Sequence, residues 1–415
     1  MNAADSLYRT LFRRAVVTGA LLSIASGAAA AQAASNDTTL RFEIYGFAQG
    51  DIGFDFGRMD PKWFDVVRPS KLPSTSDEFG KNGNFWASAR QTRFGVRGAK
   101  LTDYGDVKFV FDFDLFGVGV DAGQTTIRLR HAYGSFKNIY AGQLETPFMD
   151  LDVFPNVLDY WGPNGMMFFR NAMLQYRPID QGDHGSQIAI ALEKPGASAD
   201  AGDYTGRIEL ANVKPHFPWP DISAHYRYSG TAGHVQLAAI WRMIRWDQVP
   251  TDTFDLSGHV QGWGLSLTGN AKFARDVLHL SATYGEGIQN YFNDAPVDVG
   301  VENQFNNLRT PITGDALPIF GAMVYDDHTW NDHFTSALGW SMVNVANSDG
   351  QSGNAFHNGQ YASTNLLWTP TSNVMMGGEV QYARRANFFN DFTFNQVKLQ
   401  FSFKYSYSQL FGGKI

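Results

Sequence analysis

The chain contains no cysteine among its 415 residues. Disulfide bonds, thiol chemistry and cysteine-ligated metal sites are therefore excluded. Outside its N-terminal segment it also lacks any run of about 18 apolar residues, the length that a membrane-spanning helix requires. Basic residues are outnumbered, 33 against 40 acidic ones, and the formal net charge of −7 excludes a simple nucleic-acid-binding surface.

The familiar motifs of catalysis and cofactor binding are missing as well. The ten histidines are scattered without the spacing of metal ligands. No Gly-x-Ser-x-Gly elbow is present to carry a nucleophilic serine. A Gly-rich phosphate loop ending in Lys-Ser or Lys-Thr is also absent. The sequence therefore predicts a protein that is not an enzyme and that binds no metal and no cofactor.

The first 33 residues predict a cleaved secretory signal peptide. Three arginines within residues 9–14 precede a short run of small and apolar residues, which ends at Ala31-Gln32-Ala33. A positive start, an apolar middle and a small-x-small end are typical of such signals. A membrane anchor is the alternative, but the run is short and interrupted by Ser, Thr and Gly. We therefore divide the chain into a signal peptide, residues 1–33, and an exported domain, residues 34–415.

The exported part is rich in aromatic residues, in glycine and in segments that alternate with a period of two. The clearest segment spans residues 107–115, in which five aromatic or branched apolar residues at odd positions alternate with Lys108, Asp112 and Asp114. Such alternation predicts a strand with one apolar and one polar face. Sixteen strands are expected, at roughly 40–57, 89–99, 107–115, 125–136, 139–143, 171–177, 187–193, 221–229, 234–246, 260–273, 277–287, 319–326, 334–345, 360–368, 374–383 and 397–407.

The connections between these strands alternate between short turns and long polar segments. Outer-membrane barrels show this alternation, because their turns are short on the periplasmic side and their loops are long outside, and their strand numbers are even. In lipid the sheet must close so that no backbone group is left unpaired. The sequence therefore predicts an all-β transmembrane antiparallel barrel of about 16 strands, which is wide enough to hold an aqueous lumen.

Residues 142–170 form the third long connection and differ from the others. They combine Pro, Gly and Asp with many large apolar groups, which a solvated surface loop would not need. We expect this loop to fold into the barrel, to narrow the channel and to carry acidic groups into it. Its charged residues are Glu145, Asp150, Asp152, Asp159 and, at its end, Arg170.

Short motifs in and around this loop resemble known porins. Residues 142–148, GQLETPF, are similar to the Gly-x-x-x-Thr-Pro-Phe stretch of Gram-negative porins. Residues 158–165, LDYWGPNG, residues 169–171, FRN, and residues 44–47, IYGF, with Asp51 look like the DcaP family of outer-membrane porins. This resemblance implies a homotrimer in outer-membrane lipid of a Gram-negative bacterium. It also implies that the channel passes small anionic solutes, dicarboxylates among them.

By strand parity, a set of charged side chains faces the lumen. If the turn at residues 102–105 pairs Ala99 with Asp106, Arg93 lies opposite Asp112. A similar register in the next hairpin brings Asp112 near Arg130 and Asp114 near Arg128. The expected pore-lining residues are Arg93, Arg97, Lys108, Asp112, Asp114, Arg128, Arg130, Arg227 and Arg242.

These charges have two interpretations. In one they form a ladder that holds the wall together, each cross-strand pair contributing about 0.2–1 kcal/mol. In the other, the excess of cations over carboxylates leaves a basic wall, which faces the acidic loop across the lumen. Such a transverse field favours anions.

Function is expected to follow from this channel. The leading hypothesis is passive diffusion of small hydrophilic solutes through a water-filled pore, with a preference for anions such as dicarboxylates. A general porin without anion preference is the alternative. An outer-membrane barrel enzyme would need a Ser/His or Asp/His constellation, and an energised transporter would need a long N-terminal plug before the first strand.

Overall fold

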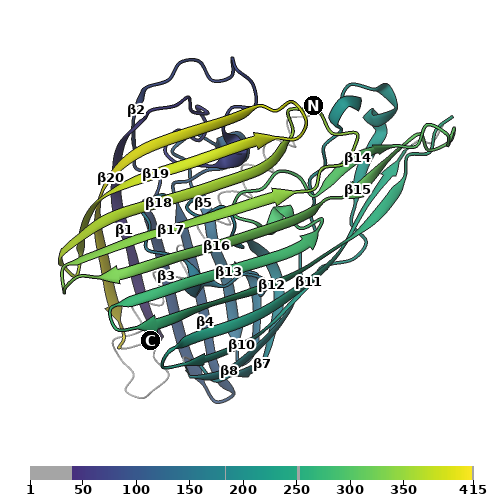
Figure 1. The fold of residues 1–415 in the computed structure, drawn as a ribbon. Coiled ribbons are helices and arrows are strands. Elements are labelled where there is room, and N and C mark those ends of the chain that lie inside the picture. The colour runs from purple at the N-terminus through teal and green to yellow at the C-terminus, as the bar shows by residue number, and fades with distance from the viewer. Residues whose placement is uncertain (1–39, 183, 250–252, 414–415) are drawn as a thin grey trace, which may run out of the picture.

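The computed structural model describes residues 40–182, 184–249 and 253–413, so the predicted signal peptide lies outside the described residues. Sixteen long strands form the wall of a barrel (Figure 1). They are β1 (Arg41–Asp55), β3 (Arg93–Thr102), β4 (Gly105–Asp114), β5 (Arg128–Phe136), β6 (Ile139–Glu145), β7 (Arg170–Asp180), β8 (Gly185–Glu193), β10 (Asp221–Gly230), β11 (Gly233–Gln248), β12 (Gly258–Phe273), β13 (Asp276–Glu286), β16 (Pro318–Thr329), β17 (Phe334–Val345), β18 (Phe356–Thr371), β19 (Val374–Asn387) and β20 (Thr393–Phe411).

The sheet closes on itself through its first and last strands. β1 pairs with β20 in antiparallel register from Phe42↔Phe411 to Asp55↔Lys398, and it pairs with β3 on its other side. Every other neighbouring pair in the wall is antiparallel as well. The prediction of a closed all-β barrel of about 16 strands is therefore confirmed.

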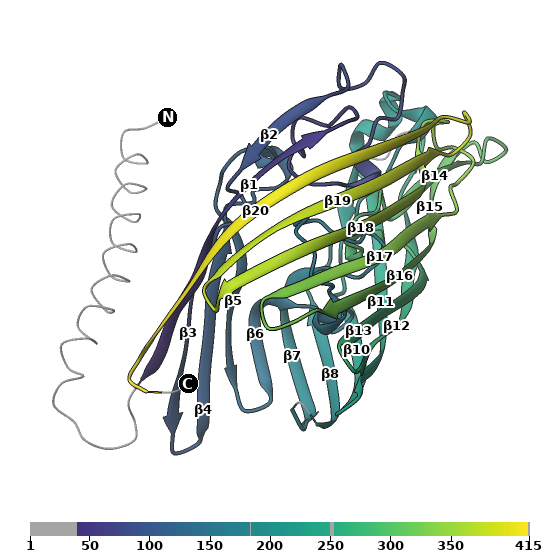
Figure 2. The ribbon, with the colours of Figure 1, turned by 60° about the vertical axis from the view of Figure 1, so that its left-hand side comes forward.

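Loop lengths alternate around the barrel as the sequence predicts. Seven connections between wall strands contain two to four residues, and the connections between them are longer. The short turns gather at one end of the barrel and the long loops at the other (Figures 1 and 2). By the rule for outer-membrane barrels, the end with the long loops is the extracellular one.

The burial pattern is the reverse of that in a water-soluble protein. Along β12, Leu265 and Leu267 point outward and are exposed, whereas Ser266 and Thr268 point inward and are buried. The same alternation of exposed apolar and buried polar residues recurs in β11, β19 and β20. An apolar outer face suits lipid, and a polar inner face suits a lumen that holds water and loops.

Four short strands and several helical turns were not predicted from the sequence. β2 (Asn84–Ser88) extends the sheet beside β1, and β9 (Val213–His216) extends it beside β11. β14 (Val299–Asn303) and β15 (Ile312–Ala316) form a separate hairpin. β2, β14 and β15 lie at the end of the barrel opposite the short turns (Figure 2). They were missed because each spans only four or five residues of a long polar segment.

The helices of the described residues are all short 3-10 turns within loops. They are η1 (Pro69–Lys71), η2 (Gly119–Asp121), η3 (Leu151–Val153), η4 (Gly202–Tyr204), η5 (Ile208–Asn212) and η6 (Gln289–Tyr291). No helix in this part of the chain is long and apolar enough to cross a membrane.

The outward face of β12 provides a test of the lipid assignment. Leu267, near the middle of the strand, is 55% exposed, and Phe273, at its end, is 52% exposed. We expect Leu267→Arg to destabilise the barrel by about 2–4 kcal/mol, because the charge lies deep in the bilayer, and Phe273→Arg to cost about 0–1 kcal/mol near the interface. Urea-dependent folding into lipid vesicles measures both. Equal losses at the two positions would contradict the assignment.

Candidate functional site

The loop that joins β6 to β7 contacts wall strands far from its own ends. Asp150 accepts a hydrogen bond of 2.7 Å from the Thr268 hydroxyl on β12, and its carboxylate lies 2.6 Å from Nε2 of His234 on β11. The backbone N–H of Asn164 donates to Ser341 on β17 at 3.0 Å. These partners are inward-facing, buried side chains. Their positions are those expected for a loop that lies against the interior of the wall.

A second anchor fixes the middle of this loop to β19. The backbone N–H groups of Leu158 and Asp159 donate to Glu379 at 2.7 and 3.0 Å. Asp159 in turn accepts a hydrogen bond of 3.1 Å from the backbone of Val67, in the first long loop. Burial, together with the nearby Glu379 carboxylate, raises the pKa of Asp159 to about 7. Two buried carboxyls, Glu379 of the wall and Asp159 of this loop, thus link the two loops to the wall.

The predicted acidic residues of the loop serve mainly as such anchors. Asp150 and Asp159 are buried. Asp152 is exposed and forms an ion pair with Arg227 on β10, which also contacts Asp150. Glu145 lies between Arg170, at 3.1 Å, and His131, at 2.5 Å. The sequence placed the four carboxylates and Arg170 in this loop, but it could not show that each carboxylate would have a partner.

The charged residues of β3, β4 and β5 do form a ladder, but in a shifted register. In the observed strand register, Arg93 lies opposite Asp114 and Ala99 lies opposite Lys108. The predicted alignment of this hairpin is therefore wrong by two residues. The reason is that the ladder continues to Thr102↔Gly105 and leaves a turn of only two residues. In the next hairpin an irregularity after Asp112 places that residue opposite His131.

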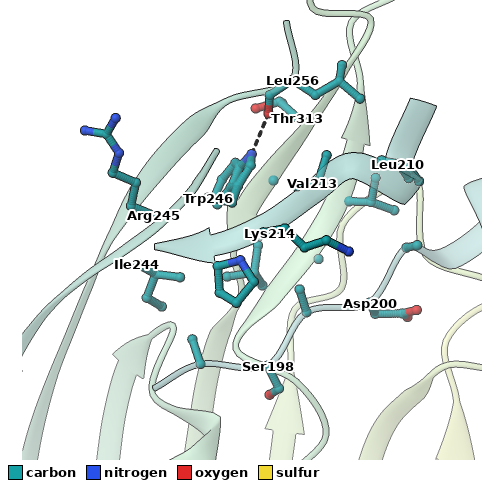
Figure 3. A pocket seen from close by; sticks show the side chains of 18 of the residues that line it. Ser198, Asp200, Leu210, Val213, Lys214, Ile244, Arg245, Trp246, Leu256 and Thr313 are labelled. Atoms are coloured by element: carbon teal, nitrogen blue, oxygen red, sulfur yellow. Dashed lines mark hydrogen bonds between the residues drawn. The ribbon is translucent and has the colours of Figure 1, made fainter. Parts of the chain in front are cut away.

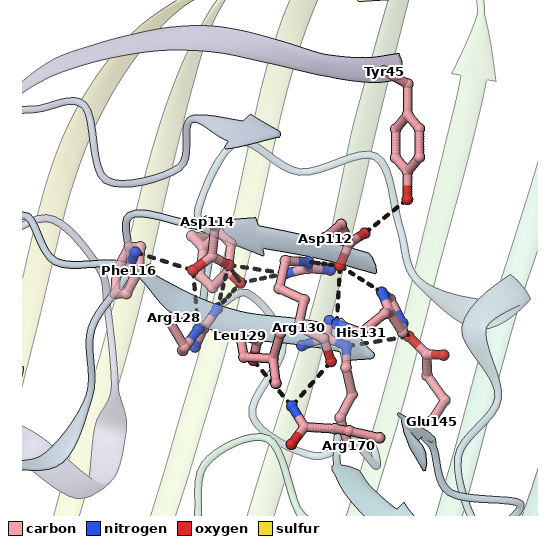
Figure 4. Close-up of polar contacts among 12 residues, drawn as sticks. Tyr45, Asp112, Asp114, Phe116, Arg128, Leu129, Arg130, His131, Glu145 and Arg170 are labelled. Atoms are coloured by element: carbon pink, nitrogen blue, oxygen red, sulfur yellow. Dashed lines mark hydrogen bonds and ion pairs between the residues drawn. The ribbon is translucent and has the colours of Figure 1, made fainter. Parts of the chain in front are cut away.

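Asp114 is the centre of this ladder (Figure 4). It accepts hydrogen bonds from Arg128 at 2.6 and 3.0 Å and from Arg130 at 3.1 Å, so the predicted proximity of Asp114 and Arg128 is confirmed. The Tyr160 hydroxyl, which comes from the loop, donates to the same carboxylate at 2.7 Å. Arg130 also lies 4.0 Å from Asp112, as expected. The wall arginines are therefore largely neutralised, and the loop is tied to them through Tyr160.

The remaining predicted residues differ in how accessible they are. Arg242 is only 1% exposed and is held by Asp221 at 2.9 Å and Asp298 at 3.0 Å, so its charge is enclosed by protein. Arg97 pairs with Glu43 at 2.6 Å. Lys108 lies exposed near a short turn. Arg93 contacts the ring of Phe47 and forms no ion pair with any described residue.

A cavity of about 720 Å³ lies among the long loops, and we call it the vestibule. Aromatic rings and cations dominate its lining. Its charged residues are the cations Lys62, Arg68, Lys71, Arg128 and Arg170 and the single carboxylate Asp60. Its large aromatic residues are Trp63, Trp161, Phe168, Phe169 and Phe292.

Two of the vestibule cations are not paired. Neither Lys62 nor Lys71 forms an ion pair with a described residue, whereas Arg68 pairs with Asp294 at 2.9 Å. Desolvation by the surrounding protein, followed by the charge of Arg68, lowers the pKa of Lys71. Sequence reasoning missed these three residues because they lie in a long loop without periodicity. The one feature of the sequence that could have indicated them is that their loop directly follows the first strand.

No group of three or more His, Asp or Glu side chains that could hold a metal ion is found in the part of the chain that the structure describes. The vestibule itself presents fixed cations beside aromatic surfaces.

The buried Asp159 makes the loop anchor dependent on pH. Its pKa is about 7 in the folded chain and about 3.9 in an unfolded one, so the folded state binds more protons between these values. The stability of the anchor is complete below about pH 4 and is lost as pH rises to about 7, by up to roughly 4 kcal/mol. Asp159→Asn cannot ionise and should remove this dependence. Hydrogen exchange of the Val67 and Trp161 amides at pH 5 and pH 7.5 measures it.

The matched control is Asp152→Asn, which changes an exposed carboxylate of the same loop. We expect that variant to retain the pH dependence of the wild-type protein. Identical pH profiles for the wild type and Asp159→Asn would contradict the role given to this carboxyl.

Comparison with known proteins relates this barrel to a family of channels. The family model described as DcaP outer membrane protein matches residues 20–407. The fold is similar to that of the outer membrane channel DcaP of Acinetobacter baumannii, with a TM-score of 0.73 and 18% identity over 90% of this chain and 99% of that chain.

Two further solved structures share the fold at lower similarity. An anion-selective porin from Comamonas acidovorans has a TM-score of 0.53 and 9% identity over 89% of this chain and 99% of that chain. The trimer form of OmpT from Vibrio cholerae has a TM-score of 0.51 and 10% identity over 89% of this chain and 100% of that chain. No curated protein matches the chain. Because the family model covers most of the sequence, this chain belongs to the DcaP outer membrane protein family, a family of outer-membrane channels.

Proposed function

We propose that this porin passes small hydrophilic solutes by passive diffusion and that it favours anions such as dicarboxylates. The observation that carries the proposal is the charge of the vestibule, where five cations face a single carboxylate. Two of those cations, Lys62 and Lys71, have no acidic partner among the described residues. Fixed cations at the mouth of a pore attract anions and raise their local concentration.

The loop between β6 and β7 supplies the constriction in this proposal. It contributes Trp161 and Phe168 to the vestibule lining, and its anchors to β11, β12, β17 and β19 hold it across the interior. We expect Arg93, which contacts Phe47 and has no carboxylate partner in the described chain, to add to this field. Conduction requires binding that is strong enough to capture the solute and weak enough to release it. Lysine and arginine side chains in a wet lumen meet both conditions, because water screens their charges.

We also propose that the channel works as a homotrimer in outer-membrane lipid. Support comes from the trimer form of OmpT, whose fold this barrel shares. Three closing steps of equal size in single-channel recordings are the expected signature. A single closing step to zero current would count against the trimer without affecting the proposed anion preference.

The two unpaired lysines give the sharpest test of anion preference. In planar bilayers we expect the concentration of a short dicarboxylate that half-blocks the chloride current to rise roughly tenfold in Lys62→Gln/Lys71→Gln, because two favourable charge contacts of about 0.5–1 kcal/mol each are lost. The control is Arg207→Gln/Arg309→Gln, which removes the same charge from outer-loop arginines that do not line the vestibule. An unchanged half-blocking concentration in the lysine variant would contradict the proposed site and favour a general porin.

A further inference from the structure

A second cavity, of about 380 Å³, lies beside the vestibule, and we call it the side cavity (Figure 3). It is lined by β9, the extracellular end of β11, the β14–β15 hairpin and residues 197–201. Most of its lining is apolar: Ala197, Ala199, Leu210, Val213, Ile244, Leu256, Val299, Val301 and Ile312. A mainly apolar cavity of a few hundred Å³ has the size and lining of small-molecule binding sites.

The polar groups at the edge of the side cavity already have partners within the protein. The Trp246 indole N–H donates to the Leu256 carbonyl at 2.7 Å (Figure 3). The Ser198 hydroxyl donates to Asn290 at 3.0 Å. Asp200 accepts hydrogen bonds from the Gly202 backbone at 2.8 Å and from Gln351 at 3.1 Å. A ligand in this space therefore needs to supply no hydrogen bonds, and a polar one would lose its own to water. The lining selects an apolar group.

The side cavity and the vestibule share a wall. Ser198 lines both, so an apolar group in the side cavity lies next to the space that holds Lys62 and Lys71. Lys214 adds a cation to the rim, and only one of its three N–H donors is used, by the Ala211 carbonyl at 3.1 Å. Arg245 also reaches the lining, but its guanidinium points away from the other labelled side chains (Figure 3). Apolar surface and free cationic donors thus lie side by side.

We propose that the side cavity binds the apolar body of an amphiphilic anion, such as a medium-chain carboxylate, while the carboxylate is held by the cations at its edge. The volume of about 380 Å³ lies within the range of small-molecule sites. We therefore choose a chain of eight carbons as the probe. The anionic half of the inference rests on the proposed anion preference of the vestibule, and the apolar half rests on the side cavity alone.

The test uses fluorine NMR of end-labelled ligands with the full protein in lipid nanodiscs. Broadening of the signal of 8-fluorooctanoate, beyond that in empty nanodiscs, reports binding, and 4-fluorobutanoate tests the contribution of the chain. Burial of each methylene strengthens binding roughly fourfold, so octanoate should bind at least tenfold more tightly than butanoate. Equal binding of the two acids would overturn the proposal.

Filling the cavity should remove this difference. In Ala199→Phe the added ring occupies the cavity, and we expect octanoate to bind no better than butanoate. Ala346→Phe is the matched control, because Ala346 lies exposed in another long loop and lines neither cavity. A second variant, Leu210→Asn, keeps the size of its side chain but makes the lining polar, and it should weaken octanoate several-fold. Octanoate binding that is unchanged in both cavity variants would overturn the proposal.

The neutral 8-fluorooctanamide separates the two halves of the inference. The amide could bind the wild-type protein as tightly as octanoate does and lose this binding in Ala199→Phe. That result would retain the apolar site and contradict the anion preference. Tighter binding of octanoate than of the amide supports both. Failure of both ligands to bind would overturn the side-cavity proposal, while dicarboxylate block in bilayers would still decide the proposed function.

Discussion

The structure depends on one constraint: in lipid, each backbone N–H and C=O of the wall must find its partner in a neighbouring strand. The pairing of β1 with β20 removes the last open edge, and with it the last unpaired row of backbone groups. Closure also divides the side chains, since period-two alternation sends one half to lipid and the other to the lumen. Leu267 and Ser266 are neighbours in sequence, yet Leu267 is exposed on the outer face of the wall and Ser266 is buried on its inner face.

Enclosing a wide polar lumen leaves space that long loops can occupy. Here the loops carry polar groups into it and bind them to the wall: the Asp150 carboxylate contacts His234, and the Asp159 backbone N–H donates to Glu379. Breaking one partner of such a buried polar pair costs more than the pair contributes, so these contacts hold the loop in one position. The vestibule cations that form no ion pair with a described residue, Lys62 and Lys71, are the charges that we propose a solute meets.

The barrel could be predicted because alternation and loop length are local properties of a sequence. Residues 107–115 show the alternation and follow a short turn, and β4 lies there as expected. The charges of β3 to β5 were assigned to one face, and the pairing of Asp114 with Arg128 was predicted correctly. The register of Arg93 was predicted wrongly, because a two-residue turn before Gly105 shifts it from Asp112 to Asp114. The vestibule lysines and the side cavity could not be foreseen. They arise where loops distant in sequence, such as residues 58–72 and 289–296, meet, and no periodicity records such contacts.

The central claim is that unpaired cations, and not the anchored carboxylates, set the field that a solute crosses. The most direct measurement is the reversal potential of the wild-type channel in a planar bilayer under a KCl gradient. We expect a potential that favours chloride, and a weaker preference at high ionic strength because salt screens exposed charges. A potential that favours potassium would contradict it and would assign selectivity to the acidic loop.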